Sequence, residues 1–175
     1  LLTITANDYT ISYGDARPNY AVTYEGFVNG DDESVLSGKL SFECEYVRGK
    51  EVNTYTITPK GLRSDKYEIT FVEGTLTVER KEVGLSWETT ELTYTGTAQV
   101  PTATATGLVN DDEIGVTVEV TGDHTNVGTS YTATATALTG TKKDNYKLPA
   151  VNTTSFSIVK VHLTVTANDH AITIA

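Results

Sequence analysis

Hydrophobic and polar residues alternate along most of the chain. Residues 2–6 place apolar side chains at every second position with threonines between them, and the same alternation recurs in residues 54–58 and 131–138. A period of two puts successive side chains on opposite faces of a β-strand. The pattern therefore predicts a mostly β protein.

A glycine interrupts this alternation between two neighbouring segments. Residues 67–71 and 75–78 both alternate, and Gly74 lies between them. Glycine adopts positive φ without strain and is common in tight hairpin turns. We predict that these segments form a hairpin whose turn contains Gly74.

Only one stretch in each half hints at a helix. Residues 31–36 begin with acidic residues and are followed by Gly38, which suits the start and the end of a helix of one or two turns. In the second half, the acidic residues run directly into the alternating segment 114–120, which disfavours a helix there. We expect at most one short helix per module.

The chain also repeats itself. Residues 2–8 return, with one substitution, as residues 163–169, and residues 26–33 are echoed by residues 107–113. A period of about 80 residues has the size of a small domain. We predict modules at residues 1–80 and 81–161, and the first strand of a third module, cut short, at residues 162–175.

The joints between the predicted modules lack flexible spacers. Residues 78–83 and 158–163 contain no glycine, proline or serine, whereas flexible linkers are rich in glycine and serine. We therefore predict a stiff array. We also predict that the strand beginning at Leu163 lies against the second module or a neighbouring chain, because its apolar residues need a partner.

Charge and composition exclude several classes of function. The net charge of −10 argues against binding to nucleic acid or to anionic lipid, both of which need clustered cations. No apolar run approaches the length of a membrane span, so no membrane insertion is expected for this segment. The single cysteine, Cys44, cannot form a disulfide within the chain.

Two acidic clusters are the main candidates for chemistry. They consist of Asp31, Asp32 and Glu33 in the first half and Asp111, Asp112 and Glu113 in the second. Neither has the alternating carboxylates of a calcium loop, so we interpret them as capping and solvated residues, with Ca²⁺ binding as the alternative. The histidines lack the spacing of metal ligands, and no serine lies in a nucleophile elbow. We predict no catalytic residue, no cofactor and no enzyme activity.

A set of tyrosine and glycine motifs points to a family. Tyr13-Gly14 follows the first alternating segment, and the second half carries Tyr94 and Gly96 at the corresponding place. Together with residues 26–31, 55–62 and 67–78, these motifs resemble the MBG-type repeat modules of large bacterial surface proteins and adhesins. The first half resembles the variety with Tyr-Gly-X, and the second half a sister variety. Independently of the family, we interpret the tyrosine–glycine pairs as structural corners.

The resemblance implies a fold, a location and a role. It implies small β-grasp-like modules, with immunoglobulin-like β-sandwiches as the alternative, strung in series outside the cell and attached to its surface or wall. It implies a non-catalytic stiff stalk or adhesion module, with a carbohydrate-binding accessory module of a surface enzyme as the alternative. The expected partners are neighbouring modules of the same chain and an unidentified glycan or protein ligand. A row of exposed aromatic side chains would favour sugar binding, and Lys–Asn isopeptide crosslinks are a further possibility in such stalks.

Overall fold

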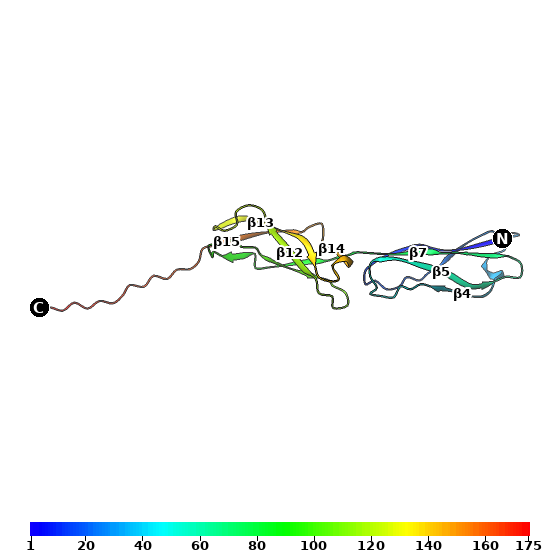
Figure 1. Ribbon diagram of the computed structural model, residues 1–175, viewed down its shortest axis with the longest axis horizontal. Helices are drawn as coiled ribbons and strands as arrows, with labels where there is room; N and C mark the ends of the chain where they lie inside the picture. The colour runs from blue at the N-terminus through cyan, green and yellow to red at the C-terminus, as the bar shows by residue number, and fades with distance from the viewer. The chain divides into compact units, whose positions relative to one another are not determined.

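The computed structural model describes residues 1–175 and is built from β-strands, loops and two short 3-10 helices, with no α-helix (Figure 1). The elements are β1 (Leu2–Ala6), β2 (Tyr9–Ser12), β3 (Val22–Glu25), η1 (Glu33–Val35), β4 (Ser37–Glu43), β5 (Asn53–Arg63), β6 (Ile69–Val72), β7 (Gly74–Glu79), β8 (Lys81–Glu82), β9 (Gly84–Glu88), β10 (Glu91–Thr93), β11 (Thr102–Thr106), β12 (Gly115–Val120), β13 (Gly128–Thr139), η2 (Lys143–Asn145), β14 (Tyr146–Lys147) and β15 (Thr153–Val159).

The first seven strands, which we call the first strand set, form two sheets. In one sheet β1 lies between β3 and β6, antiparallel to β3 and parallel to β6. The other sheet has the order β2-β7-β5-β4, with β2 parallel to β7 and the remaining pairs antiparallel. Strand β1 contacts β5 and β7, so the two sheets pack on each other.

Strands β8–β15, the second strand set, repeat this topology. The order β10-β15-β13-β12 corresponds to β2-β7-β5-β4, and β10 is again parallel to the last strand of its set. The pairs β11–β9 and β14–β8 correspond to the other sheet, in which Val83 alone interrupts the central strand. The sequence repeat is therefore also a repeat of strand order.

The compact units of the chain follow different bounds. The first unit comprises Leu1–Gly84, Ala105–Gly115 and Leu138–Ala150, and the second comprises Leu85–Thr104, Val116–Ala137 and Val151–Ala175. The first unit thus contains the first strand set together with β8, η2, β14 and the loop between β11 and β12 from the second. The module boundaries near residues 80 and 161 stay a prediction.

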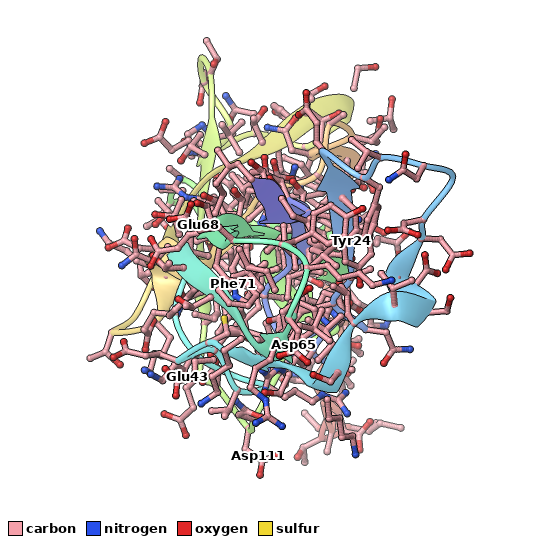
Figure 2. All side chains as sticks on the ribbon, turned by 90° about the vertical axis from the view of Figure 1, so that its right-hand side faces the viewer. Tyr24, Glu43, Asp65, Glu68, Phe71 and Asp111 are labelled. Atoms are coloured by element: carbon pink, nitrogen blue, oxygen red, sulfur yellow. The ribbon has the colours of Figure 1, made fainter.

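Alternation produces the core of the first strand set. The side chains of Leu2, Ile4 and Ala6 on β1 are buried, and the threonines between them are half-buried. Ile4 is in register with Tyr24 of β3 and Phe71 of β6, so these three side chains form a row across one face of the sheet. Figure 2 labels Tyr24 and Phe71. Burial of each large aliphatic side chain contributes about 1.5–3 kcal/mol, which fixes the register of β1.

The second strand set has a smaller core. Ala133, Phe156 and Ile158 form its buried cluster, and Trp87 and Tyr131 pack against it. The rings of Tyr131 and Phe156 stack with their centroids 5.3 Å apart. Alanine fills strand positions that carry large residues in the first set, so this core buries less apolar surface.

The predicted hairpin at Gly74 is wrong. Strand β6 belongs to the sheet of β1, whereas β7 belongs to the sheet of β2, so the chain crosses from one sheet to the other at Glu73. Gly74 is buried against the backbone of β1, and a Cβ on it would lie 2.6 Å from the carbonyl oxygen of Ala6. The glycine is needed for this close approach rather than for a hairpin turn.

The short helix predicted at residues 31–36 is only a single 3-10 turn. Asp32 caps it by accepting a hydrogen bond from the backbone N–H of Ser34 at 2.9 Å, and η1 buries none of its residues. A helix packed on the sheet would have favoured a β-grasp arrangement. The chain is all-β, and the β-grasp type is not confirmed.

The expectation that the segment from Leu163 lies against the second module is wrong, and the alternative of a neighbouring chain stays a prediction. Residues 162–175 contain no strand and are exposed throughout, with Leu163 at 78% and Ile174 at 94% exposure (Figure 1). Strand β1, which has nearly the same sequence, is held between β3 and β6. Residues 162–175 have no such neighbours within this chain.

Candidate functional site

A tight turn follows β2 and contains the Tyr13–Gly14 pair. The N–H of Asp15 donates to the carbonyl of Ser12 at 3.0 Å, and Gly14 has a φ of +89°, as at the third position of a type II turn. The N–H of Tyr13 donates to the carbonyl of Glu79 at 2.8 Å, which ties the turn to the end of β7. These bonds fix the direction of the Tyr13 side chain.

Within the same compact unit, residues 107–112 form a second turn, which we call the acceptor loop. Asn110 and Asp111 have φ of +54° and +57°, and the N–H of Asp112 donates to the carbonyl of Val109 at 2.9 Å. Two consecutive residues with positive φ are typical of a type I′ turn. The hydroxyl of Tyr146 accepts from the N–H of Val109 at 2.9 Å and donates to the carboxylate of Asp112 at 2.7 Å.

The Tyr13–Gly14 turn docks on this loop. The hydroxyl of Tyr13 donates to Oδ2 of Asp112 at 3.0 Å, and its ring meets that of Tyr146 edge-on, with centroids 5.4 Å apart and planes at 84°. Gly14 lies against Val109. Tyr13 and Tyr146 are 1% and 2% exposed, so the contact is dry. The contact buries both aromatic rings and gives the two tyrosine hydroxyls the same charged acceptor, the carboxylate of Asp112.

A polar contact lies beside the docked turn. The N–H of Val52 donates to Oδ1 of the buried Asn145 at 2.9 Å, and the carboxylate of Glu51 accepts from both Nδ2 of Asn145 and Nζ of Lys142. The hydrogen bond from Lys142 is the main cause that lowers the pKa of Glu51. Gly49 packs closely on the side chain of Asn110. Both the oxygen and the NH2 group of the buried Asn145 side chain thus have a hydrogen-bond partner.

Burial changes the acidity of the two tyrosines at the docked turn. It raises the pKa of Tyr146 to about 12, and the hydrogen bond to Asp112 adds to the shift. The pKa of Tyr13 is raised further, first by burial and then by its hydrogen bond to Asp112. Both hydroxyls remain protonated at neutral pH and serve as hydrogen-bond donors rather than as acids or bases.

The predicted acidic clusters are engaged in local contacts. Asp31 accepts from the hydroxyl of Tyr67 at 2.7 Å, Asp32 caps η1, and Asp112 accepts from two tyrosines. Glu33, Asp111 and Glu113 are exposed. No group of three or more His, Cys, Asp and Glu side chains is arranged to hold a metal ion. Of the candidate corners in the second half, Tyr94 is 39% exposed and Gly96 has a φ of +80°.

Glu51, Lys142 and Asn145 are the residue types that an isopeptide crosslink requires. However, the side chain of Lys142 is 43% exposed, and its hydrogen bond with Glu51 raises its pKa. An ammonium group is not a nucleophile. The arrangement therefore acts as a hydrogen-bonded ion pair.

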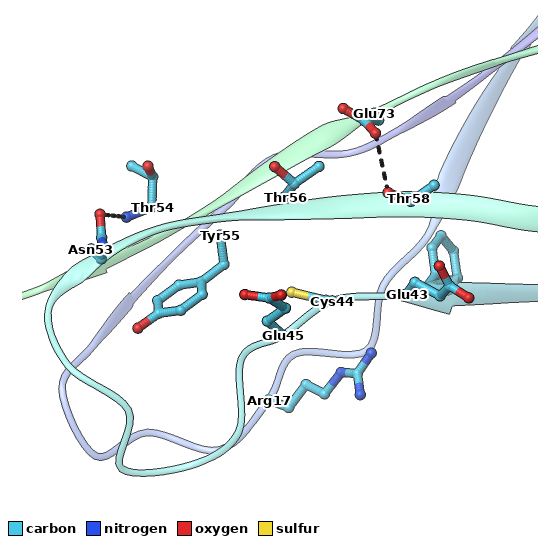
Figure 3. A pocket seen from close by; sticks show the side chains of 11 residues that line it. Arg17, Glu43, Cys44, Glu45, Asn53, Thr54, Tyr55, Thr56, Thr58 and Glu73 are labelled. Carbon is cyan, nitrogen blue, oxygen red and sulfur yellow. Dashed lines mark hydrogen bonds between the residues drawn. The ribbon is translucent and has the colours of Figure 1, made fainter.

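An open groove of about 900 Å³ lies on the first strand set, beside β4 and β5 (Figure 3). Its lining combines the acidic side chains of Glu43, Glu45 and Glu73 with the ring of Tyr55. Tyr55 is half-buried, and its hydroxyl donates to the carbonyl of Glu51 at 2.7 Å. Tyr94 is exposed, whereas every other aromatic side chain of the chain is buried or half-buried, so no row of exposed rings is present for sugar stacking.

Sequence reasoning identified Tyr13 and Gly14 but missed what they contact. Tyr13 and Asp112 are 99 positions apart, and neither residue indicates the other. The missed residues of the contact are Glu51, Val109, Asn145 and Tyr146. One available signal was the recurrence of a valine, an aspartate and a tyrosine, at positions 28, 31 and 67 and again at 109, 112 and 146.

The comparison with protein families agrees with the motif at the docked turn. Residues 2–77 match the MBG domain (YGX type). The resemblance to MBG modules is thus confirmed over these residues, in which Tyr13, Gly14 and Asp15 form the Tyr-Gly-X motif. The sister relationship of residues 81–161 stays a prediction. Comparison with curated proteins gives no match.

MBG domains are typical of the repeats of bacterial surface proteins, and the family is generally non-catalytic. Residues 2–77 are accordingly similar to the repeats of that class of protein. None of its helices has the length and apolar character needed to cross a membrane.

Proposed function

We propose that this chain is a tandem-repeat segment of an extracellular bacterial protein, attached to the cell surface or wall, and that it acts as a stiff stalk. The observation that carries the proposal is the docked Tyr13–Gly14 turn. The turn belongs to the MBG domain at residues 2–77, whereas the acceptor loop lies outside that domain, in the predicted second module. A motif residue of one repeat is thereby committed to contact with the next.

Several features support stiffness at this joint. A single residue, Arg80, separates β7 from β8, and each of these strands is paired within its own sheet. Two further contacts attach the second strand set to the first. Tyr13 binds Asp112, and Glu51 binds Lys142 and Asn145. A short link with two further points of attachment leaves little of the freedom of a glycine- and serine-rich linker.

Binding of a ligand is the alternative function that we propose. The groove beside Tyr55 offers acidic and hydroxyl groups to a glycan or a protein ligand. The half-buried state of its ring gives little stacking surface, which favours a stalk over a carbohydrate-binding accessory module. We propose no catalytic role, since the buried tyrosines and carboxylates described above are engaged in structural hydrogen bonds.

Small-angle X-ray scattering of the whole chain and its Gly14→Val variant tests the stalk. We expect the unmodified chain to scatter as one shape, whereas the variant, whose added side chain would collide with Val109, scatters as a broader ensemble. A broad ensemble for the unmodified chain would refute stiffness.

Labelling of intact cells of the source bacterium with an antibody against the chain tests the location, and labelling only after lysis would contradict it.

A further inference from the structure

The first strand set contains a second copy of the acceptor loop. The hydroxyl of Tyr67 donates to Oδ2 of Asp31 at 2.7 Å and accepts from the N–H of Val28 at 3.2 Å. The N–H of Asp31 donates to the carbonyl of Val28 at 3.0 Å, and Asn29 and Gly30 have φ of +58° and +75°. These bonds and angles match those made by Val109, Asp112 and Tyr146.

The two loops differ in what covers them. Val109 is half-buried beneath the Tyr13–Gly14 turn, and Tyr146 is 2% exposed. Val28 is 58% exposed and Tyr67 is half-buried. Figure 2 labels Tyr24 and Asp65, which lie in the strand before Val28 and in the loop before Tyr67. The same hydrogen-bonded cradle is thus covered in one repeat and uncovered in the other.

We propose that residues 26–31 and Tyr67 form a docking site for the Tyr-Gly turn of a preceding MBG module. The occupant is inferred from the covered copy, where the corresponding residues hold a turn of this type. The inference rests on the proposed stalk role for the source of the partner. In the docked state the partner's tyrosine donates to Asp31, and its glycine packs on Val28.

Charge at the uncovered site fits the same partner. When the two repeats are aligned in sequence with Tyr67 matched to Tyr146, Arg63 corresponds to Lys142 and Lys66 corresponds to Asn145. Both Arg63 and Lys66 are exposed. A partner carboxylate placed like Glu51 therefore meets two cations instead of one cation and an amide, in a chain whose net charge is −10. Complementary charge favours the correct pairing of surfaces.

The site also has a preformed shape. The ring of Phe27 packs edge-on against Tyr67, with centroids 5.5 Å apart and planes at 89°, which fixes the orientation of the Tyr67 ring. Gly26 lies beside the backbone of Leu1 and Leu2, so the loop begins next to the first strand. A rigid surface loses little conformational entropy on binding, which favours docking of a turn that is itself rigid.

The test uses the whole chain extended by a copy of its own first repeat. Residues 1–81 are placed ahead of residue 1, which reproduces the spacing between Val28 and Val109. Each Cys44 is replaced by serine, and Val28→Cys is introduced only in the original repeat. We expect a soluble thiol reagent to label this position at least about tenfold more slowly in the extended chain than in the unextended one, a docking free energy of ~1.4 kcal/mol.

Three controls make the result decisive. Val72→Cys, which is on β6 and 39% exposed, should be labelled at the same rate in both chains. Gly14→Val in the added repeat should restore fast labelling of Val28→Cys. Equal labelling of Val28→Cys with and without the added repeat overturns the inference. In the unextended chain, Val109→Cys should be labelled slowly, and fast labelling there refutes the proposed joint itself.

Discussion

Gly14 lies so close to Val109 that a Cβ on the glycine would be 2.5 Å from Cγ2 of the valine. The glycine of the Tyr-Gly-X motif therefore meets two requirements at once. Its φ of +89° forms the turn, and its missing side chain admits the acceptor loop. The second requirement distinguishes this glycine from those that only turn the chain.

Replacement of Gly14 separates these two requirements. Gly96→Ala introduces only the strain of positive φ, because the nearest atom to the added Cβ is the hydroxyl oxygen of Tyr94 at 3.7 Å. We expect this variant to lower the free energy of unfolding by about 1–2 kcal/mol. Gly14→Ala adds the collision with Val109 and should cost ~1–3 kcal/mol more. Urea unfolding measures both variants. Equal losses would show that Gly14 serves only the turn.

Loss of a tyrosine hydroxyl should depend on whether its loop is covered. Tyr146→Phe leaves the N–H of Val109 without its partner in a dry contact, and we expect a loss of about 1–3 kcal/mol in the free energy of unfolding. Tyr67→Phe removes the matching bonds where water can replace them, and should cost less than about 1 kcal/mol. The pair is compared by thermal and urea unfolding, and a larger effect at Tyr67 would contradict the prediction.

Alkaline pH should weaken the docked turn. The pKa of Tyr146 is raised from 10.0 to about 12, so above pH 10 the unfolded chain loses its proton while the folded chain keeps it. The free energy of unfolding is therefore unaffected by this group below pH 10 and falls between pH 10 and 12, with a limiting slope of ~1.4 kcal/mol per pH unit. Tyr13 acts in the same direction.

The alkaline effect is measured by urea unfolding at a series of pH values. Tyr146→Phe should flatten the decline because the titrating hydroxyl is gone. An identical decline in the variant would assign the alkaline loss to other groups.

Charge reversal at Glu51 should disturb more than an ordinary surface ion pair. Glu51 accepts from Lys142 and also from the buried Asn145, whereas Glu43 pairs only with Lys60. Glu43→Lys removes an exposed pair worth at most about 1 kcal/mol. Glu51→Lys also leaves the buried amide of Asn145 short of an acceptor, and should cost ~1–2 kcal/mol more. Similar unfolding midpoints for the two variants would argue against this role of Glu51.

Calcium should leave the stability of the chain unchanged. Asp31 and Asp112 are engaged by tyrosine hydroxyls and Asp32 by Ser34, so a cation would have to displace these bonds and still lack the six to eight oxygen ligands of Ca²⁺. We expect the same melting temperature with EDTA and with added Ca²⁺. A reproducible rise with Ca²⁺ would restore the metal interpretation of the acidic clusters.

Local pattern was enough to predict strands but not how they are assembled. Alternation correctly placed Leu2, Ile4 and Ala6 on one buried face, because burial in a strand follows the period of two. It failed at Gly74, where an ordinary turn signal marks a crossing between sheets. Which sheet a strand joins depends on partner strands distant in sequence, and the residues of a short segment do not identify those partners.

The repeated segment shows this limit most directly. Residues 2–6 and 163–167 differ by a single substitution, yet the first segment is a strand and the second is not. Strand β1 exchanges hydrogen bonds with β3 and β6, and residues 163–167 have no neighbour of either kind. Strand formation here is a property of the pairing rather than of the segment itself.

The parallel pairing of β2 with β7, and of β10 with β15, determines how the chain would carry a pulling force. In each pair an early strand of the set lies alongside its last strand and runs in the same direction. Tension applied to the two ends of such a set pulls the paired strands past each other along their length. Their hydrogen bonds are then strained together in shear instead of being opened one by one, so each set resists extension until the whole row gives way.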